Sequence, residues 1–126
     1  MLAGLTLLLA RSVGFDRDGA FYPVMLIIIA LFYVLFAVMG GSKSAIIIES
    51  VVAAIFATIA VIGYKSSMWV VTAAIAAHGA FDLVHGSLIA DPGVPAFWPA
   101  FCSSFDIAFA AGITLLILRK RTATNV

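Results

Sequence analysis

The chain has 126 residues, of which 64% are hydrophobic and 10% are charged, and its formal net charge is +1. A soluble domain carries about 25% charged residues, and one this small could not hide so much apolar surface from water. The composition therefore indicates an integral membrane protein. It excludes a basic surface for nucleic acid, and the single cysteine, Cys102, excludes an internal disulfide framework.

Five apolar stretches predict helices, and four of them have about the 20 residues that span the hydrocarbon core of a bilayer. The first stretch, residues 1–15, is shorter; we expect it to be a retained short span, because it lacks the basic start of a signal peptide. The four full spans are expected at residues 20–40, 45–63, 68–90 and 98–118. Short connections make neighbouring helices antiparallel, so the sequence predicts an all-α membrane helical bundle that forms a single transmembrane domain over residues 1–126.

Basic residues predict the orientation of this bundle. If the helices alternate in direction, only Lys43 lies on one side, and the other side carries Arg11, Arg17, Lys65, Arg119, Lys120 and Arg121. Cytoplasmic loops carry an excess of basic residues, so the second side is expected to be cytoplasmic. We therefore expect a multi-pass membrane protein, in contact with lipid, with a cytoplasmic C-terminus and an external loop at residues 91–97.

Three of the four full spans contain side chains that can ionise. They are Glu49 in the second span, His78, Asp82 and His85 in the third, and Cys102 and Asp106 in the fourth. A charged side chain at mid-membrane costs about 2.5–3.5 kcal/mol even on insertion scales, so such residues normally face the protein interior and mark function. Counting depth at about 1.5 Å per residue places all six in the outer half of the bilayer. The simplest expectation is one outward-facing polar cavity.

Metal binding is the chemistry that this pattern favours. Imidazole and carboxylate groups three or four positions apart on a helix point the same way and suit a divalent transition metal such as zinc, iron or manganese. The expected ligands are His78, Asp82, His85 and Asp106. Cys102 is expected to contact these ligands without binding the metal itself. Glu49 and Asp106 are the expected catalytic groups, with Glu49 as general acid or base. About 10 Å of helix separates the two histidines, so a single ion would bind only one of them. Both histidines would be ligands only if two ions are present.

Three stretches of the chain resemble a family of small bacterial multi-span membrane proteins known only as a domain of unknown function. They are "DRDGAFYPVMLIIIALFYVLFAVMGG", "HGAFDLVHG" and "DPGVPAFWPAFCSSFD", which together lie between Asp16 and Asp106. The resemblance implies a location in a bacterial inner (plasma) membrane, and it implies no activity. The chain is also similar to the intramembrane metal hydrolases related to alkaline ceramidases, which hold zinc with histidines and an aspartate from several helices. It is far shorter than they are and lacks a His-x-x-x-His pair.

Three functions fit these residues. The first is a metal-binding membrane protein that acts as a metal-dependent hydrolase or oxidoreductase on a lipid or other apolar substrate. The second is a transporter or channel for protons or metal ions, with the same residues as a relay. The third is a small structural subunit of a larger complex, or a homo-oligomer, in which the polar cluster holds no ion. The face of the third span beyond His78 carries Ile75 and Val71, and this favours the first function because a path across the membrane needs polar groups on both sides.

Overall fold

The computed structural model describes residues 2–14, 20–89 and 91–125, with side chains as far as Arg119. Within these residues there are helices and no strands. The helices are α1 (Leu2–Val13), α2 (Phe21–Gly40), α3 (Lys43–Ser66), α4 (Met68–Leu88) and α5 (Trp98–Asn125). The last four are long and apolar enough to cross a membrane. The prediction of an all-α bundle with four full spans and a shorter first helix is therefore confirmed.

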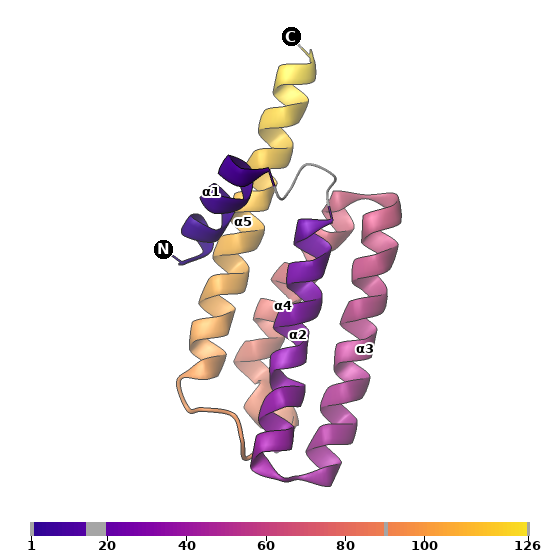
Figure 1. Ribbon diagram of the computed structural model, residues 1–126, viewed down its shortest axis with the longest axis vertical. Helices are drawn as coiled ribbons and strands as arrows, with labels where there is room; N and C mark the ends of the chain where they lie inside the picture. Colours follow the sequence, from indigo (N-terminus) through magenta and orange to yellow (C-terminus); the bar gives the residue numbers. More distant parts are fainter. Residues whose placement is uncertain (1, 15–19, 90, 126) are drawn as a thin grey trace.

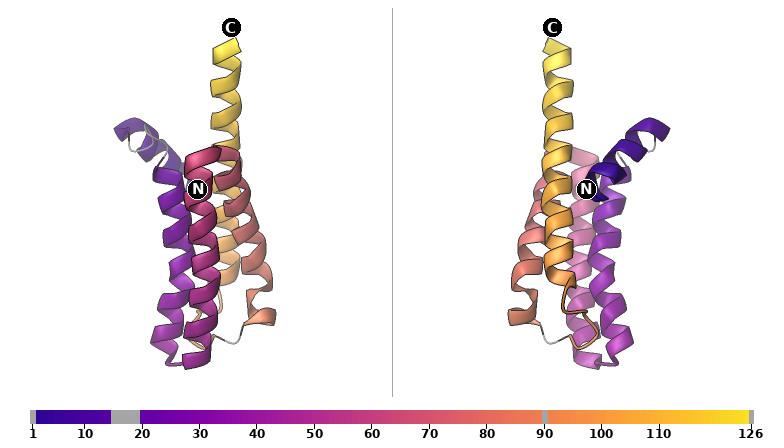
Figure 2. Two further views of the ribbon diagram at one scale, coloured as in Figure 1. Left: turned by 90° about the vertical axis from the view of Figure 1, so that its right-hand side faces the viewer. Right: turned by 90° about the vertical axis from the view of Figure 1, so that its left-hand side faces the viewer.

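The four long helices run antiparallel along the long axis of the molecule (Figure 1). α2 packs mainly against α3, α4 mainly against α5, and α3 also contacts α4. The end with the α2–α3 turn and the α4–α5 connection is called the loop end below. The opposite end, with the α3–α4 turn and the C-terminus, is called the terminal end. Two further views show α5 continuing past the other helices at the terminal end (Figure 2).

Local signals in the chain define the two short turns. Gly41 adopts a left-handed conformation with φ of 70°, which a glycine tolerates, and α2 ends there. The Ser42 hydroxyl then accepts a hydrogen bond of 3.2 Å from the backbone N–H of Ala45 and caps the start of α3. Ser67 caps α4 in the same manner through the N–H of Trp69. These turns keep α2, α3 and α4 antiparallel neighbours, as the short connections predict.

α1 is an outlying helix that packs against α5 near the terminal end (Figure 1). Gly112 of α5 allows this approach, because a Cβ atom there would lie 2.2 Å from Cδ1 of Leu7. With 12 residues, α1 is about 18 Å long, whereas the hydrocarbon core is about 30 Å thick. The short span expected for this segment stays a prediction.

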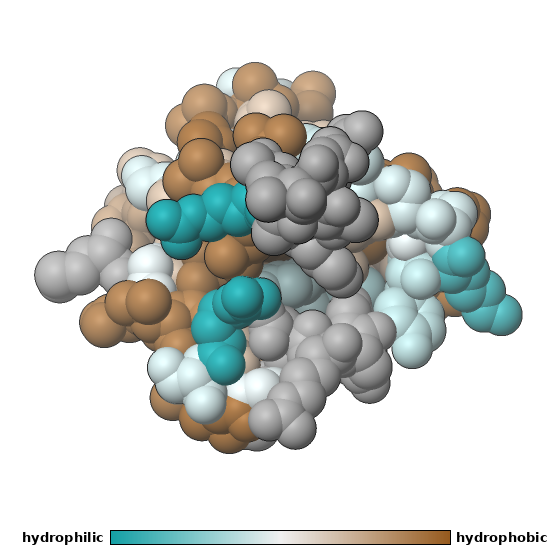
Figure 3. Space-filling model, turned by 90° about the horizontal axis from the view of Figure 1, so that it is seen from above, coloured by the Kyte–Doolittle hydropathy of each residue, from teal (hydrophilic) through white to brown (hydrophobic). Residues whose placement is uncertain are grey.

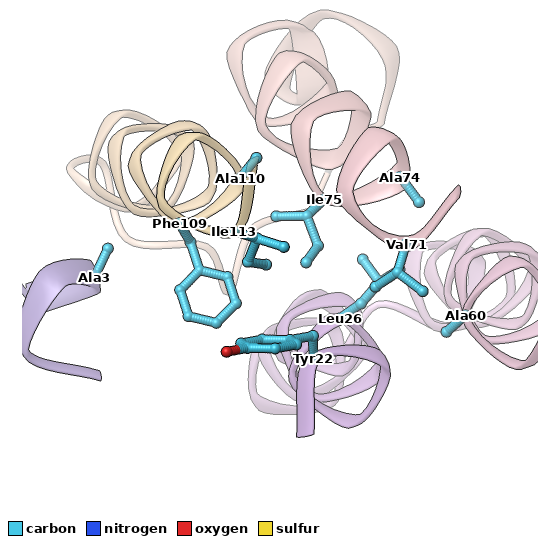
Figure 4. Packing of buried hydrophobic residues seen from close by; sticks show 10 residues of the cluster. All are labelled: Ala3, Tyr22, Leu26, Ala60, Val71, Ala74, Ile75, Phe109, Ala110 and Ile113. Atoms are coloured by element: carbon cyan, nitrogen blue, oxygen red, sulfur yellow. The ribbon is translucent and has the colours of Figure 1, made fainter. Parts of the chain in front are cut away.

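The terminal half of the bundle has an apolar core. Leu26, Val71, Ile75, Phe109 and Ile113 are each at most 1% exposed. Figure 4 shows Ile75 of α4 and Ile113 of α5 pointing into the space between these helices and α2. Ile75 precedes His78 by one helical turn and Phe109 follows Asp106 by one turn. The apolar core therefore begins directly on the terminal side of the polar residues.

The outer faces of the long helices are apolar as well. Large hydrophobic side chains such as Leu35, Ile55 and Leu83 are 50%, 53% and 66% exposed. Seen from above, the terminal end shows hydrophilic groups between hydrophobic ones (Figure 3). Exposed apolar side chains around buried ionisable ones are what a bilayer demands, because lipid tails solvate the former and not the latter. The protein is thus a membrane-embedded helical bundle.

Candidate metal centre

Four buried side chains on α4 and α5 form the inner cluster, which consists of His78, Asp82, Cys102 and Asp106. His78 and Asp82 are four positions apart on α4, and Cys102 and Asp106 are four positions apart on α5, so each pair lies on one face of its helix. The two faces meet because α4 and α5 are antiparallel and closely packed. One ligand atom from each of the four residues lies within 4.8 Å of the others.

A glycine permits this close approach. A Cβ atom added to Gly79 would lie 3.1 Å from Cβ of Asp106 and 3.1 Å from Cγ1 of Ile107. These separations are tight, so a larger side chain at this position would require Asp106 and Ile107 to move. Gly79 therefore sets the distance between the two halves of the inner cluster.

The polar contacts of the inner cluster leave one oxygen atom without a hydrogen bond. Nδ1 of His78 lies 2.8 Å from Oδ2 of Asp106 and 3.5 Å from Oδ2 of Asp82. Sγ of Cys102 lies 3.9 and 4.0 Å from the two oxygens of Asp106. Asp82 is 0% exposed, yet no hydrogen-bond donor among the described residues reaches its Oδ2. A buried carboxylate oxygen with no hydrogen bond and only a long contact to an imidazole is costly, and a bound cation would satisfy it.

The spacing of these atoms is close to that of a zinc coordination sphere. Bonds of about 2.0–2.3 Å in a tetrahedral arrangement separate neighbouring ligand atoms by about 3.3–3.6 Å. Three pairs of residues, His78–Asp106, His78–Asp82 and Cys102–Asp106, have donor atoms 2.8 to 4.0 Å apart, and all four ligand atoms lie within 4.8 Å of one another. The four donors are therefore close enough to one another to be candidate ligands of one ion.

A second group of ionisable side chains, the outer cluster, lies nearer the loop end. It consists of Glu49 from α3, His85 from α4 and Asp91 from the α4–α5 connection, whose ligand atoms also lie within 4.8 Å of one another. Nε2 of His85 lies 2.5 Å from Oε1 of Glu49, and both residues are at most 2% exposed. Oδ1 of Asp91 accepts a hydrogen bond of 3.2 Å from the Gly93 N–H, and its Oδ2 is buried without a partner among the described residues.

Asp91 lies outside the spanning segments, and its surroundings disfavour its charged form. Burial raises the pKa of the Asp91 carboxyl above its ordinary value, and the Glu49 carboxylate raises it further. The Gly93 N–H and the His85 imidazole act in the opposite direction and lower it. The net effect is a raised pKa, so a cation beside Asp91 would favour its ionised form.

The outer cluster borders a pocket of about 600 Å³ at the loop end. His85 and Asp91 contribute to its wall, together with Ser42, Ser44 and the prolines of the α4–α5 connection. Glu49 does not contribute to the wall and contacts it through His85. The inner cluster does not contribute to this wall, so the two clusters differ in their access to the loop end.

Tyr33 of α2 connects the two clusters. Its hydroxyl donates a hydrogen bond of 2.7 Å to Oδ1 of Asp82. Its ring stacks on the imidazole of His85, with 3.8 Å between ring centroids and 10° between planes. The phenol, which is 2% exposed, therefore occupies the space between His85 and the inner cluster.

The structure brings together most of the residues that the sequence predicts for the site, but in two groups. His78, Asp82 and Asp106 meet as expected, and Cys102 joins them at a distance suited to a ligand. His85, expected beside Asp82 and Asp106, pairs instead with Glu49. The reason is the ring of Tyr33, which fills the gap along α4. The arrangement of donors matches the case of two ions that the spacing of the histidines leaves open.

Sequence reasoning missed Tyr33 and Asp91 as members of the site. A tyrosine in the middle of the apolar stretch "IIIALFYVLF" was one available signal, because a buried phenol hydroxyl normally has a polar partner. Asp91 begins the turn "DPG", and the carboxylate of such a turn often bonds to the backbone two residues later. That signal does not reveal that the α4–α5 connection brings Asp91 beside Glu49 and His85.

No known protein family, curated protein or solved structure matches the chain. The chemistry of the site therefore rests on its own donors. Among the described residues, the ion pairs of Glu49, Asp82 and Asp106 are all with histidines. The clusters can thus be neutralised either by protons shared with the imidazoles or by bound cations.

Proposed function

We propose that this membrane protein binds a divalent transition metal ion, of the zinc, iron or manganese class, in the inner cluster. One observation carries the proposal: Oδ2 of Asp82 is fully buried beside His78 and has no hydrogen-bond donor among the described residues. Leaving a buried acceptor unsatisfied costs about 1–3 kcal/mol, and more for a charged group. An ion held between α4 and α5 would supply the missing partner.

The chemistry of the donors supports a transition metal over magnesium or calcium. The inner cluster offers one imidazole nitrogen, one sulfur and two carboxylates. Sulfur and imidazole favour zinc and iron, whereas magnesium and calcium take oxygen ligands. A divalent cation would also offset the two carboxylates in a region where the ion pairs of the described residues offer only imidazole.

The number of protein donors favours a site that only holds its ion over a site in which the ion catalyses hydrolysis. Four protein donors fill a tetrahedral coordination sphere, as in structural zinc sites, whereas catalytic sites keep one position open for water. Metal-dependent chemistry on a lipid or other apolar substrate is the second candidate function. It requires that Cys102, whose sulfur is the most distant donor, stay outside the coordination sphere and leave that position to water.

The apolar core supports a site reached from one side of the membrane. Ile75 and Phe109, at 0% exposure, lie one turn from the inner cluster toward the terminal end. An ion crossing the membrane would have to pass between them without polar ligands. We therefore favour binding over transport, in a bacterial inner membrane with the loop end outside, as the basic residues indicate.

Metal content tests the proposal. The full chain is purified in detergent from cells supplied with zinc, iron or manganese. Elemental mass spectrometry then measures the metal equivalents bound per protein. We expect the Asp82→Asn variant to carry one metal equivalent less than the wild type. Ser104→Ala, an exposed hydroxyl on α5 that bonds only to its own helix, is the control and should retain the full content. Equal metal in the wild type and Asp82→Asn would contradict the proposal.

A further inference from the structure

The outer cluster lies outside the proposed site, and its donors suit a metal ion in their own right. We propose that Glu49, His85 and Asp91 form a second metal site, which captures the ion from the loop end and passes it to the inner cluster. The second site stands on its own geometry, whereas the transfer step rests on the proposed function of the inner cluster.

Three segments supply the donors of this site. Glu49 lies on α3, His85 on α4 and Asp91 on the α4–α5 connection, and their ligand atoms lie within 4.8 Å of one another. One imidazole and two carboxylates are a donor set that zinc, iron and manganese share. Three protein donors leave a coordination position open to water, so an ion bound here can exchange.

The position of Asp91 is built into the fold. A Cβ atom at Gly93 would lie 1.7 Å from the carbonyl oxygen of Phe36, so this connection lies directly on the backbone of α2. Gly93 in turn donates its N–H to Oδ1 of Asp91, which leaves Oδ2 buried and without a partner among the described residues. The contact with α2 therefore holds a free carboxylate oxygen beside the Glu49–His85 pair.

Access distinguishes the outer cluster from the inner one. His85 and Asp91 contribute to the wall of the 600 Å³ pocket at the loop end, whereas all four residues of the inner cluster are buried and lie beyond Tyr33. On the terminal side the apolar core closes the bundle. An ion that reaches the inner cluster through the bundle thus meets the outer cluster first, and Tyr33, which contacts His85 and Asp82, lies between the two.

Cobalt(II) can report on the two sites separately. The inner cluster contains a sulfur ligand, so cobalt bound there produces a thiolate-to-metal absorption band in the near ultraviolet. The outer cluster has only nitrogen and oxygen donors and produces none. The full chain, stripped of metal in detergent, is titrated with cobalt and the bound equivalents are counted. Cys102→Ser assigns the band.

The wild type should bind two equivalents and show the thiolate band. Glu49→Gln should bind one equivalent and keep the band, because the amide retains the hydrogen bond to His85 but is a poor ligand. Asp91→Asn, on the connection and not within a helix, should do the same and form the band at least about tenfold more slowly in rapid mixing. Ser44→Ala, which changes the pocket wall without removing a donor, should match the wild type.

Each other result has a definite meaning. Wild-type stoichiometry and rate in both carboxylate variants would overturn the second site and leave the inner one standing. Loss of one equivalent with an unchanged rate would overturn the transfer step alone. A single equivalent that Glu49→Gln removes, with no thiolate band in the wild type, would overturn the proposed function of the inner cluster and the transfer, while supporting the outer site.

Discussion

The hydroxyl of Tyr33 donates a hydrogen bond of 2.7 Å to Oδ1 of Asp82, and both residues are buried. The bond joins α2 to α4 between the imidazole of His85, on which the phenol ring stacks, and the inner cluster. It also fixes one oxygen of the carboxylate, so that the other oxygen faces His78. Tyr33 therefore positions Asp82 toward the proposed metal ion.

Tyr33→Phe should destabilise the metal-free protein by about 1.5–3 kcal/mol, the usual value for a hydrogen bond to a charged group. The phenyl ring keeps its stacking on His85, so the loss isolates the hydroxyl. Unfolding in mixed micelles with increasing dodecyl sulfate, followed by circular dichroism, measures the difference. Tyr64→Phe is the control, because Tyr64 is 49% exposed, and it should change stability by less than about 0.5 kcal/mol. Equal effects of the two substitutions would remove the special role of Tyr33.

Gly79→Val should impair the inner cluster selectively. The valine side chain would meet Asp106 and Ile107 on α5 and drive the two helices apart. We expect the thiolate band of the cobalt-loaded protein to weaken or require at least about tenfold more metal. Gly86→Val on the same helix is the matched control, because nothing lies within 4 Å of a Cβ atom at Gly86. An unchanged band in Gly79→Val would contradict the close α4–α5 contact.

Gly93→Ala should impair the outer cluster selectively. Gly93 does not have a positive φ, so alanine meets a steric obstacle and no conformational one. The new methyl group would collide with the Phe36 carbonyl oxygen and displace the connection that carries Asp91. We expect loss of one cobalt equivalent, retention of the thiolate band and a lower melting temperature. Gly86→Ala should keep both equivalents, and a similar loss in that variant would argue against the mechanism.

Metal ions should stabilise the chelator-treated protein at pH 7.5 and much less at pH 5. Protons compete with the metal for the imidazole and carboxylate donors, so lowering the pH weakens binding. An ion at 100 times its Kd adds about 2.7 kcal/mol to the stability of the folded state. Thermal unfolding with zinc, iron(II) or manganese measures the effect, with magnesium as the control. The shift should shrink in His85→Ala and in Asp82→Asn and vanish when both are combined. A melting curve insensitive to every transition metal at both pH values would point to protonated clusters.

The loop end should face the outside of the cell. The motive is the excess of basic residues on the side of the C-terminus. Ala96→Cys and Thr122→Cys, each in a Cys102→Ser background, are treated with a membrane-impermeant thiol reagent in intact cells. Labelling at position 96 alone is expected. Labelling at position 122 alone would invert the topology and place the pocket on the cytoplasmic side.

The spans and the local faces of the site could be predicted from the sequence because they depend on short-range properties. A run of about 20 apolar residues specifies a spanning helix, and the helical repeat places His78 beside Asp82 and Cys102 beside Asp106. Depth along each helix follows from the same count. These inferences need no knowledge of how one helix is rotated against the next.

Only the tertiary structure decided which faces meet. Gly79 lets α5 approach α4 closely enough to close the inner cluster, and Gly93 lets the α4–α5 connection lie on α2 and bring Asp91 to His85. Tyr33, from a helix without any of the expected ligands, fills the space that separates the two clusters. Such contacts depend on the volume and rotation of side chains from segments far apart in the chain, and no local pattern encodes that information.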